Sequence, residues 1–269
     1  MGEAIVITSG KGGVGKTTTT ANLGTALALL GKRVCLVDTD IGLRNLDVIM
    51  GLENRIIYDL VDVVEGRCAV QKALVKDKRF DDLLYLLPAA QTSDKSAVTP
   101  EQMKQLIDEL KQDYDYVLID CPAGIEQGYK NAVAGADQAI VVTTPDVSAV
   151  RDADRIIGLL EKEENIRPPR LIINRIRSHM VKNHDMLDID EIVMHLSIDL
   201  LGIIADDDNV IKASNNGEPI VLDPNSKASL AYRNIARRLL GESVPLLSLE
   251  DEENKGLLAK IKKFFGVRS

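Results

Sequence analysis

The chain has 269 residues, of which 45% are hydrophobic and 28% charged, and its formal net charge at pH 7 is −8. A chain of this length and composition can bury an ample core as one large α/β domain or as two small ones. The acidic balance argues against a protein that coats nucleic acid, because such a protein needs a basic surface to displace counterions from phosphates.

Cysteines and apolar runs indicate where the protein works. Cys35, Cys68 and Cys121 are scattered and have no CxxC spacing, so neither a disulfide framework nor a metal cluster is predicted. No apolar run approaches the ~18 to 20 residues that span a bilayer. The first residues also lack the basic flank and the long apolar core of a signal peptide. We therefore expect a protein that stays in the reducing cytoplasm.

Short runs rich in Val, Ile and Leu alternate with longer amphipathic segments, which is typical of parallel βαβ units. Strands are predicted at Ala4–Thr8, Arg33–Val37, Leu83–Leu87, Tyr116–Ile119, Gln138–Thr143, Arg170–Asn174 and Leu200–Ile204. The clearest helices are predicted at Lys16–Leu30, Pro100–Gln112, Ser148–Glu161 and Lys227–Leu240. The pattern predicts an α/β fold over residues 1–241, with a doubly wound, mostly parallel sheet flanked by helices.

Capping residues mark the ends of several of these helices. Gly31 and Gly241 directly follow two of the helical patterns, where glycine commonly ends a helix. Thr99 precedes Pro100 and is followed by Gln102 three residues later, which is the pattern of a capping box.

The stretch SGKGGVGKTT lies where the first strand ends and the first long helix begins. It matches GxxxxGK[ST] with Gly10, Gly15, Lys16 and Thr17. Glycines let backbone N–H groups converge on phosphate oxygens, and the N-terminus of the helix adds its positive dipole end. The lysine can reach the β and γ phosphates and the threonine hydroxyl can bind Mg²⁺. The motif and its context together predict a phosphate-binding loop.

Three carboxylates follow two other predicted strands. Asp38 and Asp40 follow the second strand, and Asp120 ends the strand VLID. Parallel sheets place their ligands at the carboxyl ends of their strands. One apolar strand that ends in Asp is common, but two such strands beside a phosphate loop are not. We therefore expect Asp120 to coordinate Mg²⁺ and the other two to lie close by.

The last residues, 242–269, differ from the rest of the chain in composition and periodicity. Residues 242–254 are short, acidic and without a sustained period, so they are predicted to be a linker. On a helix, the apolar residues of the segment 255–269 would form one stripe: Leu257, Leu258, Ile261, Phe264 and Phe265. Lysines flank that stripe: Lys255, Lys260, Lys262 and Lys263. This pattern predicts an amphipathic helix that lies in the interface of an anionic membrane. The alternative is that the stripe docks on the parent domain.

The phosphate loop holds a second lysine, Lys11, which an ordinary phosphate cradle does not require. With it, GKGGVGKTT resembles the deviant Walker A ATPases of the ParA–MinD family. In that family the early lysine reaches across a dimer interface to the ATP of the partner subunit. The resemblance implies an ATP-sandwich dimer in which each subunit completes the other's site. A fixed cation there would stabilise charge that builds up on the transferred phosphoryl group.

Longer stretches resemble the branch of this family that selects the bacterial division site: DTDIGLRNLDVIMGLENRIIYDL, LLPAAQTSDKSAVT, DCPAGIEQG, TTPDVSAVRDADRIIGLL and ASNNGEPIVLD. The resemblance implies catalytic roles for Lys11, Lys16 and Asp40, with Asp40 positioning the attacking water. It implies Mg²⁺ binding by Thr17 and Asp120, with Asp38 just behind them. The implied ATP-binding residues are Gly10, Lys11, Gly12, Gly13, Val14, Gly15, Lys16, Thr17, Thr18 and Asn174, of which Asn174 would hydrogen-bond adenine. Ala205 stands where some relatives have Pro beside the base.

The helix that follows TTPDV carries Arg151, Asp152 and Asp154. From spacing alone such a charged face is usually solvated, whereas the resemblance implies that it receives regulatory partners. Those partners would be the division inhibitor MinC and, depending on lineage, MinE or another topological factor. We expect no specific nucleic acid partner.

The resemblance implies an ATPase that hydrolyses ATP to ADP and phosphate slowly unless it is stimulated. ATP binding would form the dimer, bring it to the cytoplasmic face of the cell membrane through paired C-terminal helices, and allow it to recruit MinC; hydrolysis would release it. Three alternatives remain. A flagellar-number relative usually carries an extra N-terminal segment, whereas this chain enters its first strand within four residues of Met1. A ParA-type DNA segregation ATPase would need a basic surface, and a P-loop synthetase would need further substrate-binding groups.

Overall fold

The structure is a computed structural model that describes residues 1–247. Part of the predicted linker and the whole predicted membrane helix, 255–269, lie outside the described residues. Within residues 1–247 one sheet of eight strands has the order β3-β4-β2-β5-β1-β6-β7-β8. Neighbouring strands are parallel except β3, which is antiparallel to β4. The strands are β1 (Glu3–Thr8), β2 (Val34–Asp38), β3 (Val75–Lys76), β4 (Leu84–Leu87), β5 (Tyr116–Asp120), β6 (Gln138–Thr143), β7 (Arg167–Ile176) and β8 (Asp199–Ala205).

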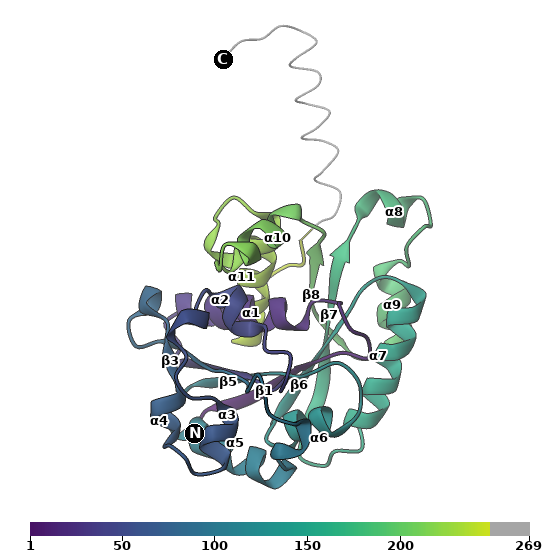
Figure 1. Ribbon diagram of the computed structural model, residues 1–269. Coiled ribbons are helices and arrows are strands. Elements are labelled where there is room, and N and C mark those ends of the chain that lie inside the picture. Colours follow the sequence, from purple (N-terminus) through teal and green to yellow (C-terminus); the bar gives the residue numbers. More distant parts are fainter. Residues whose placement is uncertain (248–269) are drawn as a thin grey trace, which may run out of the picture.

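Helices cover both faces of this sheet (Figure 1). They are α1 (Lys16–Leu29), α2 (Leu46–Met50), α3 (Leu60–Val64), α4 (Val70–Ala73), α5 (Pro100–Asp113), α6 (Gln127–Ala134), α7 (Val147–Leu160), α8 (Ser178–Lys182), α9 (Ile189–Leu196), α10 (Asp208–Asn215) and α11 (Lys227–Leu239). Short 3₁₀ turns occupy Glu53–Arg55, Lys78–Phe80, Lys95–Ala97 and Ile220–Leu222. Among these helices of residues 1–247, none has the length and apolar character needed to cross a membrane.

Side chains of each strand alternate between two separate cores, one on each face of the sheet. In β1, Ala4 and Val6 join the core beneath α3 to α7 and α9, whereas Ile5 and Ile7 join the core beneath α1, α2 and α11. All four residues are fully buried. Because both faces are covered, the central strands consist of continuous apolar runs, as expected of a parallel sheet.

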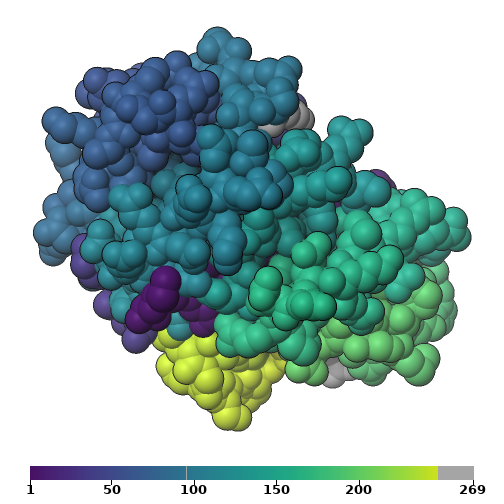
Figure 2. All heavy atoms as spheres, turned by 90° about the horizontal axis from the view of Figure 1, so that it is seen from below, coloured from purple at the N-terminus to yellow at the C-terminus, as the bar shows by residue number. Residues whose placement is uncertain are grey.

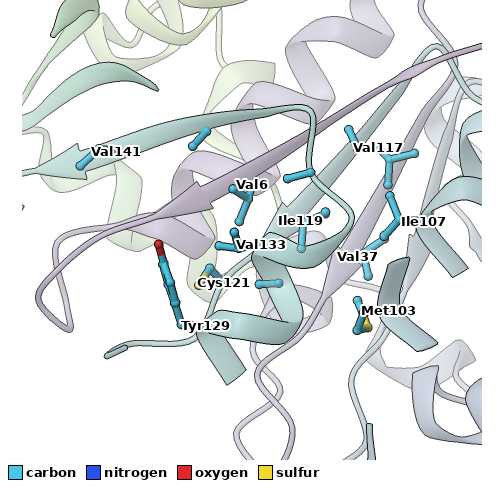
Figure 3. Close-up of a cluster of buried hydrophobic side chains, with 14 of the residues drawn as sticks. Val6, Val37, Met103, Ile107, Val117, Ile119, Cys121, Tyr129, Val133 and Val141 are labelled. Carbon is cyan, nitrogen blue, oxygen red and sulfur yellow. The ribbon is translucent and has the colours of Figure 1, made fainter. Parts of the chain in front are cut away.

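The first of these cores is built from strand valines and isoleucines packed against α5 and α6 (Figure 3). Figure 3 shows Met103 and Ile107 of α5 close to Val37 and Val117 of the sheet. Tyr129 and Val133 of α6 come from the other end of the same cluster. Seen from below, this side of the molecule is formed by the blue, teal and green segments, and the yellow α11 reaches the view only at its lower rim (Figure 2). The two helical layers therefore lie on opposite faces of the sheet.

The predicted strands and long helices are all confirmed, with small differences at their ends. Thr99 forms the expected capping box with Gln102, and Gly31 and Gly241 have φ values of 78° and 86°, the left-handed conformation that ends a helix. Strand β7 begins three residues earlier than predicted. Pro168 and Pro169 near its start are typical of a loop, and for this reason the sequence did not indicate a strand there. Strand β3 and the helices α2 to α4, α6 and α8 to α10, each of eight residues or fewer, were not predicted individually from the sequence.

The first residues after α11 stay attached to that helix. Arg238 donates to the carbonyl oxygen of Val244 at 2.8 Å and to that of Pro245 at 2.6 Å. Arg237 forms an ion pair with Glu242 at 2.8 Å, and Leu247 packs against the core beneath α11. The beginning of the predicted linker is thus held against the domain.

Candidate active site

The phosphate loop connects β1, the central strand, to α1. Gly13 and Gly15 have φ values of 78° and 105°, which an L side chain adopts only with strain. A Cβ atom on Gly15 would lie 2.4 Å from Nδ2 of Asn174, so a larger residue here would displace the Asn174 amide as well as strain the backbone. Left-handed glycines before a helix N-terminus turn backbone N–H groups toward one point and make an anion-binding concavity.

Lys16 lies inside this loop and is only 7% exposed. Its Nζ atom lies 3.0 Å from the Oγ atom of Ser9, and Ser9 in turn donates to the carbonyl oxygen of Lys11 at 2.7 Å. The buried ammonium is therefore held across the loop by Ser9, a residue that was not predicted to belong to the site. Ser9 is the residue that precedes the first glycine of the motif, which was the available signal.

Asp38 and Asp120 end two neighbouring strands and are register partners in the β2–β5 pair. Oδ1 of Asp38 accepts the N–H of Asp40 at 2.9 Å, and Oδ2 accepts the N–H groups of Asn45 and Leu46 at 3.3 and 3.2 Å. Burial raises the pKa of Asp38 to about 6, although these N–H groups act in the opposite direction. The Asp38 carboxylate thus stabilises the turn that carries Asp40 and the N-terminus of α2.

Asp120 is 2% exposed. Burial, together with the neighbouring Asp38, raises the pKa of Asp120 to about 8. Hydrogen bonds from the hydroxyls of Thr17 and Thr20 and the charge on Lys16 act against this, and the Thr20 bond is 3.2 Å long. Mg²⁺ prefers oxygen ligands and usually combines one or two carboxylates with phosphate oxygens. The buried carboxylates beside the Thr17 hydroxyl fit that requirement, because a divalent cation would relieve their repulsion.

Lys11 leaves the phosphate loop in another direction. Its side chain is 44% exposed, and its Nζ atom lies 2.7 Å from Oγ of Ser148 and 3.3 Å from Oδ1 of Asp146. Burial acts to raise the pKa of Asp146, but hydrogen bonds from Thr144, Ser148, Ala149 and Lys11 outweigh it and hold that pKa at about 2. Neither Asp146 nor Ser148 was predicted to be a site residue.

The geometry at the start of α7 explains these partners. Asp146 is the N-cap of α7 and accepts the N–H of Ala149 at 3.1 Å. Its carboxylate also accepts the Ser148 hydroxyl at 2.8 Å. An aspartate two residues before a serine at the start of a helix is a capping signal that can be recognised in the sequence. The contact of this aspartate with a lysine 135 positions earlier depends on the fold and has no signal in the local sequence.

Asn174, the residue predicted to hydrogen-bond adenine, lies near the end of β7 and is buried. Its Nδ2 atom donates to the carbonyl oxygen of Val14 at 2.8 Å, which joins the end of β7 to the phosphate loop. A cavity of about 200 Å³ opens beside it. The cavity is lined by Gly15, Thr18, Asn174, Arg175, Arg177, Ile204, Ala205, Asp206, Asp207, Asp208, Val210, Ile211 and Tyr232. Ala205, where some relatives have Pro, is therefore part of the wall of the candidate base pocket.

The charged residues predicted to bind partners lie on α7. Arg151 and Asp154 are exposed, and Asp152 forms a 3.6 Å ion pair with Arg155. The phosphate loop touches this helix directly, because a Cβ atom on Gly10 would lie 2.0 Å from the backbone oxygen of Asp152. Arg151 and Asp154 also line a groove of about 610 Å³ between α7 and α9.

The structure therefore brings Lys16, Thr17, Asp38 and Asp120 together and places Asn174 beside them. The ammonium group of Lys11 hydrogen-bonds to Ser148 at the N-terminus of α7, whereas that of Lys16 hydrogen-bonds to Ser9 within the phosphate loop. The predicted membrane residues, Leu257 to Phe265, lie outside the described part of the chain. A phosphate loop after a central parallel strand, with carboxylates at the ends of two neighbouring strands, defines the protein as a P-loop nucleoside triphosphatase.

Comparisons with known proteins place the chain more narrowly. Residues 5–220 match the CobQ/CobB/MinD/ParA nucleotide binding domain. The chain is 81% identical to the septum site-determining protein MinD of Bacillus subtilis over 269 residues, which is the full length of both. The chain belongs to this nucleotide-binding family and, within it, to the MinD ATPases that determine the site of the division septum.

Solved structures agree with this assignment. The MinC:MinD cell division protein complex of Aquifex aeolicus is 53% identical, with a TM-score of 0.84 over 91% of this chain and 98% of that one. The septum site-determining protein MinD of Pyrococcus horikoshii, solved with Mg-ADP, is 29% identical, with a TM-score of 0.81 over 91% of this chain and all of that one.

Proposed function

We propose that this ATPase is a membrane switch. In this proposal two ATP-bound subunits form a sandwich dimer, the dimer binds the cytoplasmic face of the membrane through its paired C-terminal helices, and it recruits MinC. Hydrolysis to ADP and phosphate releases it. The hydrolysis step acts as a timer and is slow until a partner or the membrane stimulates it.

The two lysines of the phosphate loop extend their side chains in different directions, and this observation carries the proposal. Lys16 is buried and hydrogen-bonds inside the loop, whereas Lys11 is 44% exposed and lies on α7. A single phosphate cradle is served by Lys16. The second ammonium is held at the surface, from which it can reach the phosphates of a facing subunit. Dimerisation then depends on ATP because its phosphates supply the counter-charge.

Each residue of the site has a definite part in this proposal. Asp40 accepts a hydrogen bond from the attacking water and orients it toward the γ phosphate. Lys16 from its own subunit and Lys11 from the facing subunit stabilise the charge that develops on the transferred phosphoryl group. Mg²⁺, held by Thr17 and Asp120 with Asp38 behind them, would neutralise phosphate oxygens.

The predicted tail explains why dimerisation would control membrane binding. Burying five large apolar side chains partway contributes on the order of 5 to 8 kcal/mol, and each lysine near anionic lipid contributes about 1 kcal/mol. Ordering the helix costs roughly 1 kcal/mol per residue, so one tail binds weakly. Two tails on one dimer raise the avidity by ~10² to 10⁴. ATP would therefore decide how many tails bind at once.

The partner surface is proposed to be α7 with its charged residues Arg151, Asp152 and Asp154. The phosphate loop touches this helix at two points: Gly10 lies against Asp152, and Lys11 binds the N-cap residue Asp146. When Lys11 engages ATP of the facing subunit, that N-cap loses a cation. The similarity to the subunit of the MinC:MinD complex supports MinC as the partner; MinE or another topological factor would supply the stimulation of hydrolysis.

The test is sedimentation with anionic liposomes in Mg-ATP and in Mg-ADP. The proposal expects binding with ATP, little binding with ADP, and retained binding after Asp40→Ala, which should trap the ATP state. Removal of residues 255–269 should abolish sedimentation and leave nucleotide binding intact. Replacing Phe264 and Phe265 by Ser should weaken it with the lysines still present.

Two results would contradict the proposal. Equal sedimentation with ATP and ADP would show that nucleotide does not control the membrane. Full sedimentation of the shortened chain would remove the role given to the tail. Purified MinC added to the liposomes should cosediment only with ATP, and Asp154→Ala should weaken that step without weakening lipid binding.

A further inference from the structure

We propose that Arg79 is a positioning residue that fixes α10, which lines the base pocket, against α2, which follows the Asp38–Asp40 turn. Occupation of the pocket by adenine would thereby help to hold the turn that carries Asp40. The inference rests on the proposed base site beside Asn174, and it goes further by connecting that site to the hydrolytic residues. Figure 1 shows α10 and α2 on the same face of the sheet, and the two helices are in contact.

Arg79 joins the C-terminal ends of the two helices. Its Nη2 atom donates to the carbonyl oxygen of Met50, the last residue of α2, at 2.6 Å. Its Nη1 atom donates to the carbonyl oxygen of Gly217, two residues beyond α10, at 3.3 Å. The guanidinium is itself fixed by three hydrogen bonds to the buried Asp77, two from Nε at 2.9 and 3.1 Å and one from Nη2 at 2.7 Å. Only arginine offers several donors in one rigid plane for such a task.

The backbones of the two helices meet between these carbonyls. Gly51 and Gly217 both have left-handed φ values, 66° and 67°. A Cβ atom on Gly217 would lie 2.6 Å from the Cα atom of Gly51, and one on Gly51 would lie 2.6 Å from the oxygen of Gly217. This approach is possible only for two glycines, so the two helix ends cannot move independently by much without losing the contact.

Each helix has its other end at the nucleotide site. The N-terminus of α2 is held by Asp38, which accepts the N–H groups of Asn45 and Leu46. The same carboxylate accepts the N–H of Asp40. On the other side, Asp208, Val210 and Ile211 of α10 line the cavity beside Asn174. Contacts therefore run from the base pocket through α10, the glycine pair and α2 to the Asp38–Asp40 turn.

This arrangement gives the base a part in placing the catalytic turn. A purine that fills the cavity restrains α10, and the rigid contact with α2 restrains the helix whose first N–H groups bind Asp38. Phosphates alone restrain the loop and the metal site but not α10. Physical contiguity has to be tested by measuring coupling between the two ends.

Hydrogen exchange of the full chain with Mg-ADP and with Mg-pyrophosphate separates the contribution of the base. Both ligands occupy the phosphate loop, but only ADP carries adenine. We expect ADP to slow exchange in residues 46–51 at least about fivefold more than pyrophosphate does, the low end of couplings between sites. Gly217→Ala should remove this difference, because its Cβ has no room.

Gly66→Ala is the matched control. Gly66 has a φ of 72°, close to that of Gly217, but a Cβ atom there would meet nothing within 4 Å. It carries the same conformational strain without the clash, so the difference between ADP and pyrophosphate should persist. Arg79→Lys keeps a charge beside Asp77 but loses the planar fork, and should reduce the difference partway. In ATP hydrolysis, Gly217→Ala should lower kcat by a larger factor than it raises KM.

Three results overturn the inference. One is slowed exchange in α10 but not in residues 46–51 of the unmodified chain, which would leave the base site and the proposed function in place. Another is that Gly66→Ala removes the difference in protection between ADP and pyrophosphate as fully as Gly217→Ala does. A third is failure of ADP to protect α10 at all, which would refute the base site as well.

Discussion

Asp38 and Asp120 are register partners at the carboxyl ends of two adjacent strands, and their side chains are 1% and 2% exposed. Two like charges in one buried place are costly unless a cation or a proton is shared between them. Burial raises the pKa of Asp38 to about 6, and burial together with the charge of Asp38 raises the pKa of Asp120 to about 8. The pair is therefore poised to exchange protons for a divalent cation.

The first prediction concerns the stability of the protein without nucleotide and metal. Both carboxylates have folded-state pKa values above the ordinary value of 3.8, so the folded state binds more protons than the unfolded state between pH 4 and 8. The free energy of unfolding contributed by the pair is complete below about pH 4 and falls as the pH rises through 6 and 8. Asp38→Asn should flatten the profile, by an amount on the order of 2 to 3 kcal/mol between pH 4 and 8.

Urea unfolding at several pH values in EDTA measures this effect. Asp81→Asn, at an exposed position away from the site, is the control and should keep the slope of the unmodified chain. A slope that is identical in Asp38→Asn and in the unmodified chain would contradict the assigned pKa shift. Mg-ADP should stabilise the unmodified chain more at pH 8 than at pH 5, because the cation competes with protons for the same oxygens.

The second prediction concerns Lys11. Its contacts with Asp146 and Ser148 are partly exposed, and such pairs contribute about 0 to 1 kcal/mol. Lys11→Ala should therefore leave the unfolding midpoint nearly unchanged and nucleotide affinity within a few-fold, but should abolish the proposed ATP-dependent dimer. Light scattering after gel filtration measures the dimer. Lys104→Ala, which removes an exposed lysine paired with Asp108, is the control and should dimerise normally.

Much of the site could be predicted because its signals are contiguous. The glycines, Lys16 and Thr17 occupy one short motif, and Asp38 and Asp120 each end an apolar strand, so their meeting follows from a parallel sheet alone. The partners of Lys11 could not be predicted in that way. Asp146 and Ser148 become its neighbours only because β1 and β6 are adjacent strands and their following loops meet.

The fold shows the same division. Long strands and helices have periodicity and capping signals, and they were predicted within a few residues. Strand β3 has only two residues and pairs through backbone atoms, so it is too short to show the alternation of apolar and polar residues that indicates a strand. Helices α2 to α4 have four or five residues each, too few for one apolar stripe to be recognised. The contact of Gly51 with Gly217 depends on tertiary packing across 166 positions and has no local signature.

The third prediction concerns Gly10 and the contact between the phosphate loop and α7. A Cβ atom on Gly10 would lie 2.0 Å from the backbone oxygen of Asp152, so Gly10→Ala should displace the loop or the helix and destabilise the protein by about 1 to 3 kcal/mol. Gly12→Ala is the control in the same loop, because its Cβ would meet only Ala123 at 3.8 Å. Urea midpoints measure both. Equal midpoints for the two variants would show that the loop does not rest on α7.

The last prediction concerns Asp40. Its backbone N–H donates to Asp38, and any residue except proline keeps that bond, so Asp40→Ala should leave the metal site formed. The proposed loss is confined to the orientation of water, and the rate of hydrolysis should fall by about 10² to 10⁴. Because ATP then persists, the proposed dimer should accumulate at ATP concentrations at which the unmodified chain is proposed to cycle.

Single-turnover hydrolysis with chemical quench, combined with light scattering in ATP, distinguishes this outcome from simple damage. An unchanged rate would exclude Asp40 as the water-positioning residue. A lost rate accompanied by a lost dimer would place its effect on nucleotide binding instead. Asp40→Asn keeps a hydrogen-bond acceptor in the same position but lacks the charge. It should recover part of the rate if orientation of the water is the main contribution, because an amide oxygen can still accept one of its hydrogen bonds.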